Sequence, residues 1–302
     1  MSEAQLEDKA AGGGLAQRLA GDVRAAVTGL FAALEVLRHR PRRGVAPRIP
    51  FDGILELIIL FILVGSLAAA SMILVDPFIP GLRARLPLEL VRFFERVTDL
   101  GLGSVVLWPL GLSLLATLGA MPHLDPLRRR AAAAVAARLG FVFTCVVGIS
   151  LPVLVVKYAL GRARPSAALM LPGPNAQLTF DWFAMRPSYS SFPSGHSTVV
   201  FAVVVALAAL YPRARWPLLA LGVLVAASRV VLGSHYPSDV LAGAALATAF
   251  TLWMVKVFAA KRLVFAVAGD GTITPKAGPS MRRFLALFSP SHRDMGLEEA
   301  RS

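Results

Sequence analysis

The stretch SFPSGHSTVVFAVVVALAALYP, residues 191–212, places a short polar turn directly before an apolar run of helical length. The turn joins a proline to small residues at the start of the expected helix. Free backbone N–H groups and the helix macrodipole at such a start favour a bound anion. The sequence therefore predicts an anion site at the end of a helix whose other side chains suit a lipid bilayer.

Composition extends this membrane assignment to most of the chain. Hydrophobic residues make up 56% and charged residues 16% of the 302 residues, which is more apolar than a soluble domain of this size. We therefore expect an all-α, polytopic membrane protein with six transmembrane helices. The apolar stretches of spanning length are residues 54–75, 100–120, 131–156, 197–211, 216–233 and 240–258.

The formal net charge of +13 is explained by membrane topology. The basic residues gather beside the apolar stretches and do not follow one solvated face, as they would for nucleic acid. By the positive-inside rule the four regions that hold them are cytoplasmic, which requires an even number of crossings between each pair. Six crossings satisfy this parity and place both termini in the cytoplasm. The regions contain Arg38, Arg40, Arg42, Arg43 and Arg48; Arg128, Arg129 and Arg130; Arg213 and Arg215; and Lys256, Lys261 and Arg262.

Two segments flank the predicted membrane domain of residues 51–260. Residues 1–50 form a cytoplasmic segment with an amphipathic helix and a basic, proline-broken end. This helix either rests on the anionic cytoplasmic leaflet or packs against the protein's own spans, and the sequence supports both interpretations equally. Residues 261–302 form a cytoplasmic polar tail, which we expect to be poorly ordered from Gly269 onward.

A further amphipathic stretch follows the first span on the outer side. Leu90, Val91, Phe94 and Val97 share one face of the helix that this spacing predicts. The helix either lies in the interface and shapes the entry to a site, or packs against the protein.

Parity also brings three polar clusters to one face of the membrane. The first two, residues 157–165 and 193–196, lie between the third and fourth spans, and the third, residues 228–239, joins the fifth span to the sixth. Two crossings separate them, so all three end on the side opposite the arginine-rich regions. An ionisable group costs roughly 2.5–3.5 kcal/mol at the bilayer centre, so several in one place indicate a functional site.

The first cluster carries two cations before a proline. Lys157 and Arg164 are seven residues apart, about two helical turns, so both side chains are expected to point the same way before Pro165. Two aligned cations at a helix end suit a phosphate, although both could instead only anchor the span at the headgroup level. Arg162 faces elsewhere on the helical wheel, and we assign it to headgroup anchoring.

The second cluster is the turn that opens the fourth span. Ser194 and Gly195 can offer an anion their N–H groups, and Ser194 can alternatively act only as an N-cap. His196 is one of two histidines predicted on this face, and both lie in the clusters.

The third cluster reads Ser228-Arg229-x5-His235-x3-Asp239. This spacing allows a carboxylate just inside the sixth helix to turn back on the imidazole, with Pro237 at the helix start. Such a carboxylate fixes the tautomer of the ring and stabilises the cation that forms when its other nitrogen attacks an electrophile.

Carboxylates are scarce in these clusters. Asp181 and Asp239 are the two in the catalytic regions, too few for a site with two magnesium ions. Two histidines and three cations suffice for phosphoryl transfer, so we expect no metal and no other cofactor.

Taken together, the clusters Lys157-x6-Arg164-Pro165, Pro193-Ser194-Gly195-His196 and Ser228-Arg229-x5-His235-x3-Asp239 resemble the signature of the type 2 phosphatidic acid phosphatase superfamily. This superfamily includes the vanadium-dependent haloperoxidases. The resemblance is close over residues 131–258 and extends to the first two spans by topology. It implies a six-helix membrane fold with a catalytic core formed by the last four helices and a pocket on the outer face.

The resemblance also implies a role for each signature residue. His235 would be the nucleophile that forms a phosphohistidine, Asp239 would orient it, and His196 would protonate the leaving oxygen. The residues that would hold the phosphate oxygens are Lys157, Arg164, Ser194, Gly195 and Arg229.

We therefore expect a metal-independent phosphatase of a lipid phosphate or diphosphate, with a periplasmic site in a bacterial inner membrane. Its expected partners are the lipid substrate and the bilayer. Alternatives are a lipid phosphotransferase with the same histidine and a phosphate or phospholipid transporter; a haloperoxidase is disfavoured in so embedded a chain. The lipid stays open among phosphatidic acid, phosphatidylglycerol phosphate, a polyprenyl diphosphate and a glycolipid phosphate. Residues 166–190 are the natural place for headgroup selection.

Overall fold

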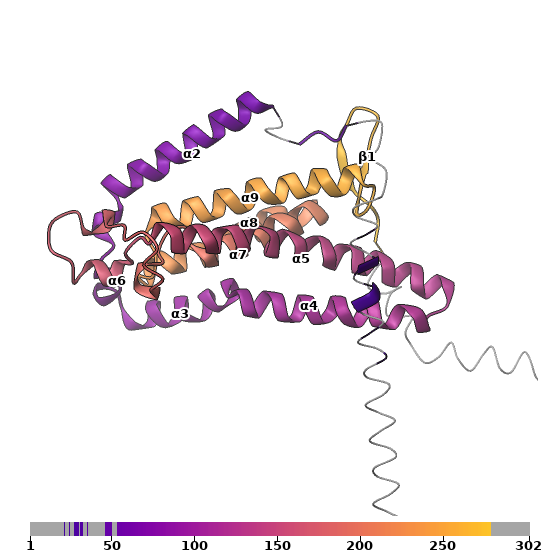
Figure 1. The fold of residues 1–302 in the computed structure, drawn as a ribbon, viewed down its shortest axis with the longest axis horizontal. Helices are drawn as coiled ribbons and strands as arrows, with labels where there is room; N and C mark the ends of the chain where they lie inside the picture. Colours follow the sequence, from indigo (N-terminus) through magenta and orange to yellow (C-terminus); the bar gives the residue numbers. More distant parts are fainter. Residues whose placement is uncertain are drawn as a thin grey trace, which may run out of the picture. The chain divides into compact units, whose positions relative to one another are not determined.

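The computed structural model describes residues 53–278, residues 46–49 and scattered positions between 21 and 35. These residues are mostly helical, which confirms the all-α class (Figure 1). The chain forms two compact units. One contains Arg43–Leu110 and Phe141–Pro275 and holds every predicted site residue; the other contains Met1–Arg42, Gly111–Gly140 and Lys276–Ser302.

The six predicted spans correspond to six helices: α2 (Ile54–Leu74), α4 (Gly103–Ala120), α5 (Pro126–Leu160), α7 (Gly195–Leu210), α8 (Arg215–Val231) and α9 (Pro237–Ala260). Five helical segments of the described residues are long and apolar enough to cross a membrane, and they include all of these helices except α7. Helix α7 has 16 residues, a length of about 24 Å, and is therefore short for a hydrocarbon core of about 30 Å.

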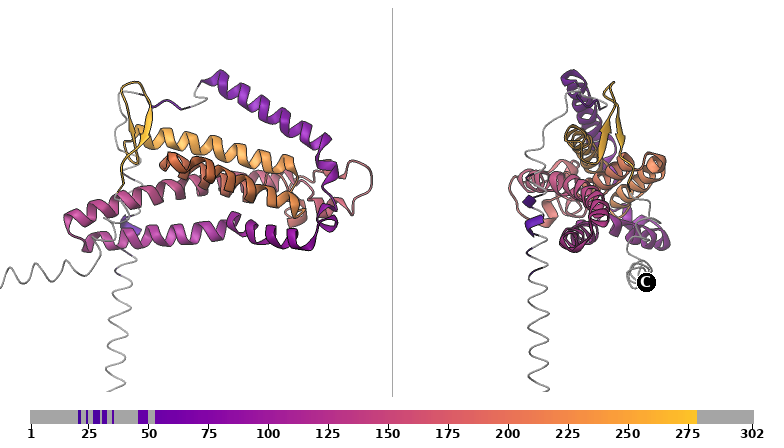
Figure 2. Two further views of the ribbon diagram at one scale, coloured as in Figure 1. Left: turned by 180° about the vertical axis from the view of Figure 1, so that it is seen from behind. Right: turned by 90° about the vertical axis from the view of Figure 1, so that its right-hand side faces the viewer.

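Helices α7, α8 and α9 run side by side in both views of the ribbon (Figures 1 and 2). Valines fill the space between α7 and α8, where Val200, Val204 and Val225 are almost completely buried. On the other side, a Cβ on Gly243 of α9 would lie only 2.5 Å from the Ser194 carbonyl oxygen. The absence of that carbon lets α9 approach the start of α7, so the first turns of these two helices meet.

Short elements link the long helices. Helix α3 (Leu88–Thr98) is the amphipathic helix expected around residues 90–97, and it packs against α8. The other short elements are α6 (Pro165–Ala168) and the 3-10 helices η1 (Asp76–Phe78), η2 (Leu82–Arg85), η3 (Asp99–Gly101), η4 (Met121–His123), η5 (Ala176–Leu178), η6 (Pro187–Tyr189) and η7 (Pro212–Ala214).

A small β-hairpin follows α9. Strands β1 (Phe265–Val267) and β2 (Ile273–Pro275) pair in antiparallel register. Phe265 is buried, with its ring 5.2 Å from that of Phe141 in an edge-to-face arrangement. The expectation of a poorly ordered chain from Gly269 onward is therefore wrong for β2, because this apolar contact holds the hairpin on the helices.

The second compact unit has its own small apolar cluster. Leu114 and Leu118 of α4 pack there against Ala136 of α5. The described positions between 21 and 35 are helical, while most of the amphipathic helix predicted in residues 1–50 lies outside the described residues, as do residues 279–302.

Candidate active site

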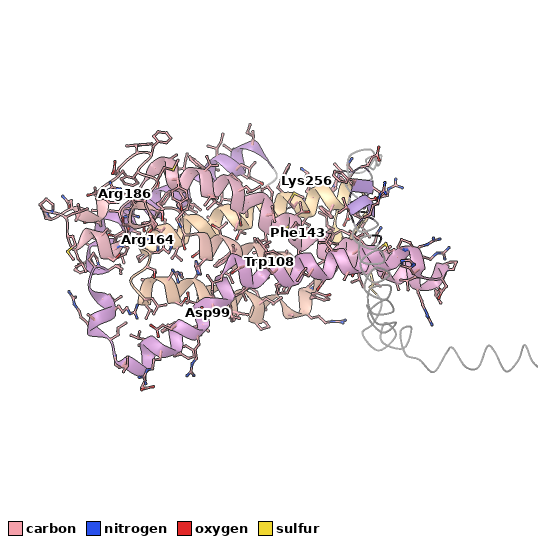
Figure 3. All side chains as sticks on the ribbon, turned by 60° about the horizontal axis from the view of Figure 1, so that its bottom comes forward. Asp99, Trp108, Phe143, Arg164, Arg186 and Lys256 are labelled. Carbon is pink, nitrogen blue, oxygen red and sulfur yellow. The ribbon has the colours of Figure 1, made fainter. Side chains whose placement is uncertain are left out.

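The three polar clusters meet at one end of the helices. Lys157 lies in the last turn of α5 and Arg229 in the last turn of α8, while α7 and α9 begin at the same end. The Lys157 ammonium nitrogen is 3.9 Å from the point where a Cβ of Gly195 would be. Figure 3 shows Arg164 towards this end and Lys256 towards the other. The clusters, which parity allows to converge, therefore do gather at one end of the helices.

The backbone between Lys157 and Arg164 is not a continuous helix. Helix α5 ends at Leu160, and Gly161 takes a left-handed φ of 58°. A side chain on Gly161 would clash with the carbonyl of Asp181, so only glycine fits here. The two-turn alignment predicted for the pair is therefore wrong in its geometry, although both cations belong to the same end of the bundle.

Two arginines have polar atoms available for an anion. Arg164 donates one hydrogen bond to the Ser190 hydroxyl at 3.3 Å, and Arg229 donates one to the Thr98 hydroxyl at 2.8 Å. The Nε atoms of both are buried and have no hydrogen-bond partner among the described residues. Buried polar groups are rarely left unpaired, so this pattern favours an anion between the two guanidinium groups.

Charges also couple these groups to the histidine of the second cluster. His196 lies within electrostatic reach of Arg229, His235, Lys157 and Arg164. A histidine among three cations and next to the nucleophile candidate is placed to exchange a proton with a group on the bound anion.

Ser194 serves as the N-cap of α7. Its hydroxyl oxygen accepts hydrogen bonds from the Ser197 backbone N–H at 3.4 Å and from the Ser197 hydroxyl at 3.0 Å. Its own N–H donates to the Asp239 carbonyl oxygen at 3.0 Å. Ser194 is thus an N-cap, and the prediction that its N–H is free for an anion is wrong because the Asp239 carbonyl occupies it. Only the hydroxyl proton of Ser194 remains for a phosphate oxygen.

His235, in the turn between α8 and α9, faces Asp239 in the first turn of α9. The His235 Nδ1 atom is 3.6 Å from Asp239 Oδ2, slightly beyond hydrogen-bond distance. Burial lowers the pKa of the His235 imidazole to about 4, against the opposing effect of the Asp239 carboxylate. The ring is therefore neutral at physiological pH, with the lone pair of one nitrogen available for attack.

The structure corrects the assignment of Arg162. This side chain is completely buried and forms ion pairs with Asp239 at 2.6 Å and with Asp76 at 2.8 Å. It is therefore not a headgroup anchor. Asp76 was not predicted from the sequence either, although an aspartate directly after an apolar stretch of spanning length is a usable signal.

An apolar pocket of about 480 Å³ opens beside the site. Leu86, Val91 and Leu169 contribute to its wall, and Arg83 is the one charged residue among the described residues that line it. Pro165, next to Arg164, and Gly233, two residues before His235, also line it. The pocket therefore adjoins the polar site next to its first cluster, at Pro165, and next to its third cluster, at Gly233.

Within the described part of the chain, no three histidine, cysteine or acidic side chains are grouped as metal ligands would be. Both buried carboxylates of the site, Asp76 and Asp239, instead face a guanidinium group. The donor set thus suits an anion better than a divalent cation.

Fold and site together define a polytopic membrane protein in which three cationic side chains and two histidines gather at one end of the helices. A model of the PAP2 superfamily matches residues 134–263. The lipid A 1-phosphatase of Rhizobium johnstonii is 34% identical over 202 residues, which cover 67% of this chain and 80% of that protein. The chain belongs to the PAP2 superfamily, as its signature predicts.

Two further similarities concern parts of the chain. The lipid A 1-phosphatase of Rhizobium etli is 40% identical over 131 residues, which cover 43% of this chain and 55% of that protein. A crystal structure of a PAP2-type phosphatidylglycerolphosphate phosphatase from Bacillus subtilis aligns with a TM-score of 0.46 and 22% identity, over 65% of this chain and 92% of that one.

Proposed function

We propose that the protein is a metal-independent membrane phosphatase that removes the phosphate of a lipid through a phosphohistidine on His235. The observation that carries this proposal is the meeting of Lys157, Arg164 and Arg229 with two histidines at one end of the helices, where both arginine Nε atoms lack a partner among the described residues. A neutral, buried imidazole beside a carboxylate adds the nucleophile.

The first step forms the covalent intermediate. Nε2 of His235 attacks phosphorus because Nδ1 faces Asp239. As the N–P bond forms, the bond from phosphorus to the lipid oxygen breaks. His196, which is protonated in the complex because the negative phosphate offsets the three cations around it, gives its proton to that oxygen. The charge on the remaining phosphate oxygens is balanced by the three cations, which supply the electrostatic stabilisation that a metal supplies elsewhere.

The second step returns the enzyme to its starting state. Water attacks the phosphohistidine while neutral His196 accepts a proton from it. The N–P bond breaks, its electron pair returns to Nε2 of His235, and inorganic phosphate leaves. His196 again carries the proton with which it began, and the net reaction converts one lipid phosphate and one water into the dephosphorylated lipid and inorganic phosphate.

We infer that the substrate is a glycolipid of the lipid A type, which loses its 1-phosphate. Two curated relatives from Rhizobium are named lipid A 1-phosphatase, and one of them aligns over 80% of its length. The apolar pocket beside Pro165 and Gly233 suits the part of a lipid next to its phosphate.

The active site of the proposed enzyme faces the periplasm. Arg213 and Arg215 lie where α7 joins α8, and Lys261 and Arg262 follow α9. These are the helix ends opposite the candidate site, and the positive-inside rule assigns them to the cytoplasm. Residues of the outer loop, 166–190, would then meet the headgroup.

A panel of lipids tests the reaction and the substrate together. Purified protein in detergent is offered lipid A, phosphatidic acid, phosphatidylglycerol phosphate and undecaprenyl diphosphate, and free phosphate and the lipid products are measured. We expect free phosphate from all reactive lipids and the highest kcat/KM for lipid A, with loss of the 1-phosphate. Transfer of the phosphoryl group to a second lipid without free phosphate would favour the phosphotransferase, and no reaction at all would favour a transporter.

Metal removal should leave the reaction unchanged. Cationic side chains of the protein, rather than a bound metal ion, are proposed to balance the phosphate charge. Incubation with EDTA followed by gel filtration should therefore leave kcat within about twofold of its starting value. Phosphate release before and after chelation measures this. Activity that is lost with EDTA and restored by magnesium would contradict the proposed chemistry.

A further inference from the structure

Arg162 is the centre of a buried polar network behind the candidate nucleophile. Its Nη1 atom donates to Asp239 Oδ1 at 2.6 Å and to the Ser238 hydroxyl at 2.7 Å. Its Nη2 atom donates to Asp76 Oδ2 at 2.8 Å, and its Nε atom donates to the Gln177 carbonyl oxygen at 3.0 Å. One guanidinium group thus joins η1, which directly follows α2, to the outer loop and to the start of α9.

The Asp76 carboxylate accepts hydrogen bonds at both of its oxygens. Its Oδ1 atom accepts hydrogen bonds from the Ser71 hydroxyl at 3.0 Å and from the Ser238 N–H at 3.3 Å. Its Oδ2 atom also accepts a short hydrogen bond from the Ser238 hydroxyl. The carboxylate therefore binds the N-terminus of α9 directly, where the helix dipole favours a negative charge.

The two carboxylate oxygens of Asp239 have different partners. Oδ1 accepts from Arg162, whereas Oδ2 accepts from the Ser191 hydroxyl at 2.5 Å and the Tyr236 N–H at 2.9 Å and faces Nδ1 of His235. Arg162 thus donates a hydrogen bond to only one oxygen of the Asp239 carboxylate. A guanidinium group that met a single carboxylate would prefer the two-pronged arrangement, which takes both oxygens.

Asp76 prevents that arrangement, because it occupies the second prong of the same guanidinium group. The Tyr236 ring, 4.3 Å from the guanidinium carbon, further fixes the plane of Arg162. The side chains of Arg162, Asp76 and Asp239 are all fully buried. If one charge moves, the others must move with it, because a buried charge without its partner is costly.

We propose that Asp76 and Arg162 are positioning residues, which set the Asp239 carboxylate so that its Oδ2 atom faces the His235 ring. The inference rests on the proposed phosphatase function and extends it to the end of the first membrane helix. Neither residue touches the substrate, so both act on turnover through Asp239 and leave phosphate binding to Lys157, Arg164 and Arg229.

The test uses two conservative variants of the full-length protein, Asp76→Asn and Arg162→Lys. The first keeps the shape of the side chain and removes its charge, and in the second a lysine cannot hold two carboxylates in a fixed plane. We expect kcat for phosphate release to fall roughly 10- to 100-fold, the loss that follows a small misplacement of a catalytic group. KM and the inhibition constant of inorganic phosphate should stay within about twofold, since the three cations are unchanged.

Matched controls use an exposed ion pair on α3. Arg92 and Glu89 are 3.2 Å apart and largely exposed. Arg92→Lys and Glu89→Gln repeat the chemical changes away from the network, and they should leave kcat within about twofold of wild type. Melting temperatures in detergent identify variants that have lost their fold, and Ser238→Ala provides a milder change of the same network if Arg162→Lys does not fold.

A double-mutant cycle separates positioning from general stabilisation. If Asp76 acts through Asp239, then Asp76→Asn should lower kcat by less than about twofold in a protein that already carries Asp239→Asn. Undiminished kcat in folded Asp76→Asn and Arg162→Lys proteins, or full additivity with Asp239→Asn, would overturn the inference. Failure of the phosphatase proposal itself would look different, because wild-type protein would then release no phosphate or His235→Ala would retain it.

Discussion

Replacement of His235 by alanine is expected to lower phosphate release by at least about 10⁴-fold, because the variant lacks the imidazole that is proposed to form the covalent intermediate. The residual rate would come from the cations, which still bind and polarise the phosphate. Turnover of the preferred lipid, measured as free phosphate from purified protein, gives the loss. Binding of inorganic phosphate should persist in this variant, since its three cationic ligands are intact.

A histidine outside the site provides the control. His123 lies in η4, in the other compact unit of the chain. His123→Ala should release phosphate at the wild-type rate, within about twofold. Phosphate release by a folded His235→Ala protein at the rate of this control would remove the basis of the proposed mechanism.

Asp239→Asn is expected to have the next largest effect, a loss of kcat of about 10³- to 10⁴-fold. Asparagine keeps the size of the side chain but removes the charge that stabilises a cationic His235, and its amide can hold the ring in the wrong tautomer. It also leaves Arg162 with one buried carboxylate instead of two. The melting temperature of the Asp239→Asn protein should therefore be measured together with kcat, to show that the variant is folded.

The proposed role of Asp239 predicts that the loss of activity falls on kcat and not on KM. KM should change little because the phosphate ligands stay in place, whereas formation of the phosphohistidine should slow in single-turnover experiments. An Asp239→Asn protein that forms the intermediate at the wild-type rate would show that the carboxylate serves only the fold.

The arrangement of the helices could be predicted from the sequence in considerable detail. Hydrophobic runs indicate membrane helices because a span must place about 20 residues in hydrocarbon. The span predicted at residues 54–75, for example, differs by one residue from α2 at Ile54–Leu74. The β-hairpin was missed. Its strands are only three residues long, and one of them is fixed by the buried ring of Phe265.

The candidate site was predicted where spacing alone brings residues together. His235 and Asp239 lie four positions apart, and they face each other as their spacing predicts. The helical wheel failed at Arg162 because it assumes a helix, whereas α5 ends at Leu160 and Gly161 reverses the backbone. Asp76 is distant in sequence from its partner, so only the folded structure could reveal the pair.

In the proposed mechanism the phosphoryl group passes through His235. The most direct measurement uses His196→Ala protein, which should form the intermediate with p-nitrophenyl phosphate, whose leaving group needs no proton, and then hydrolyse it slowly. We predict a burst of one p-nitrophenol per active chain, and an acid-labile phosphoryl group on the peptide that contains His235 by mass spectrometry. A phosphoryl group on another residue, or turnover with no intermediate under these conditions, would contradict the account.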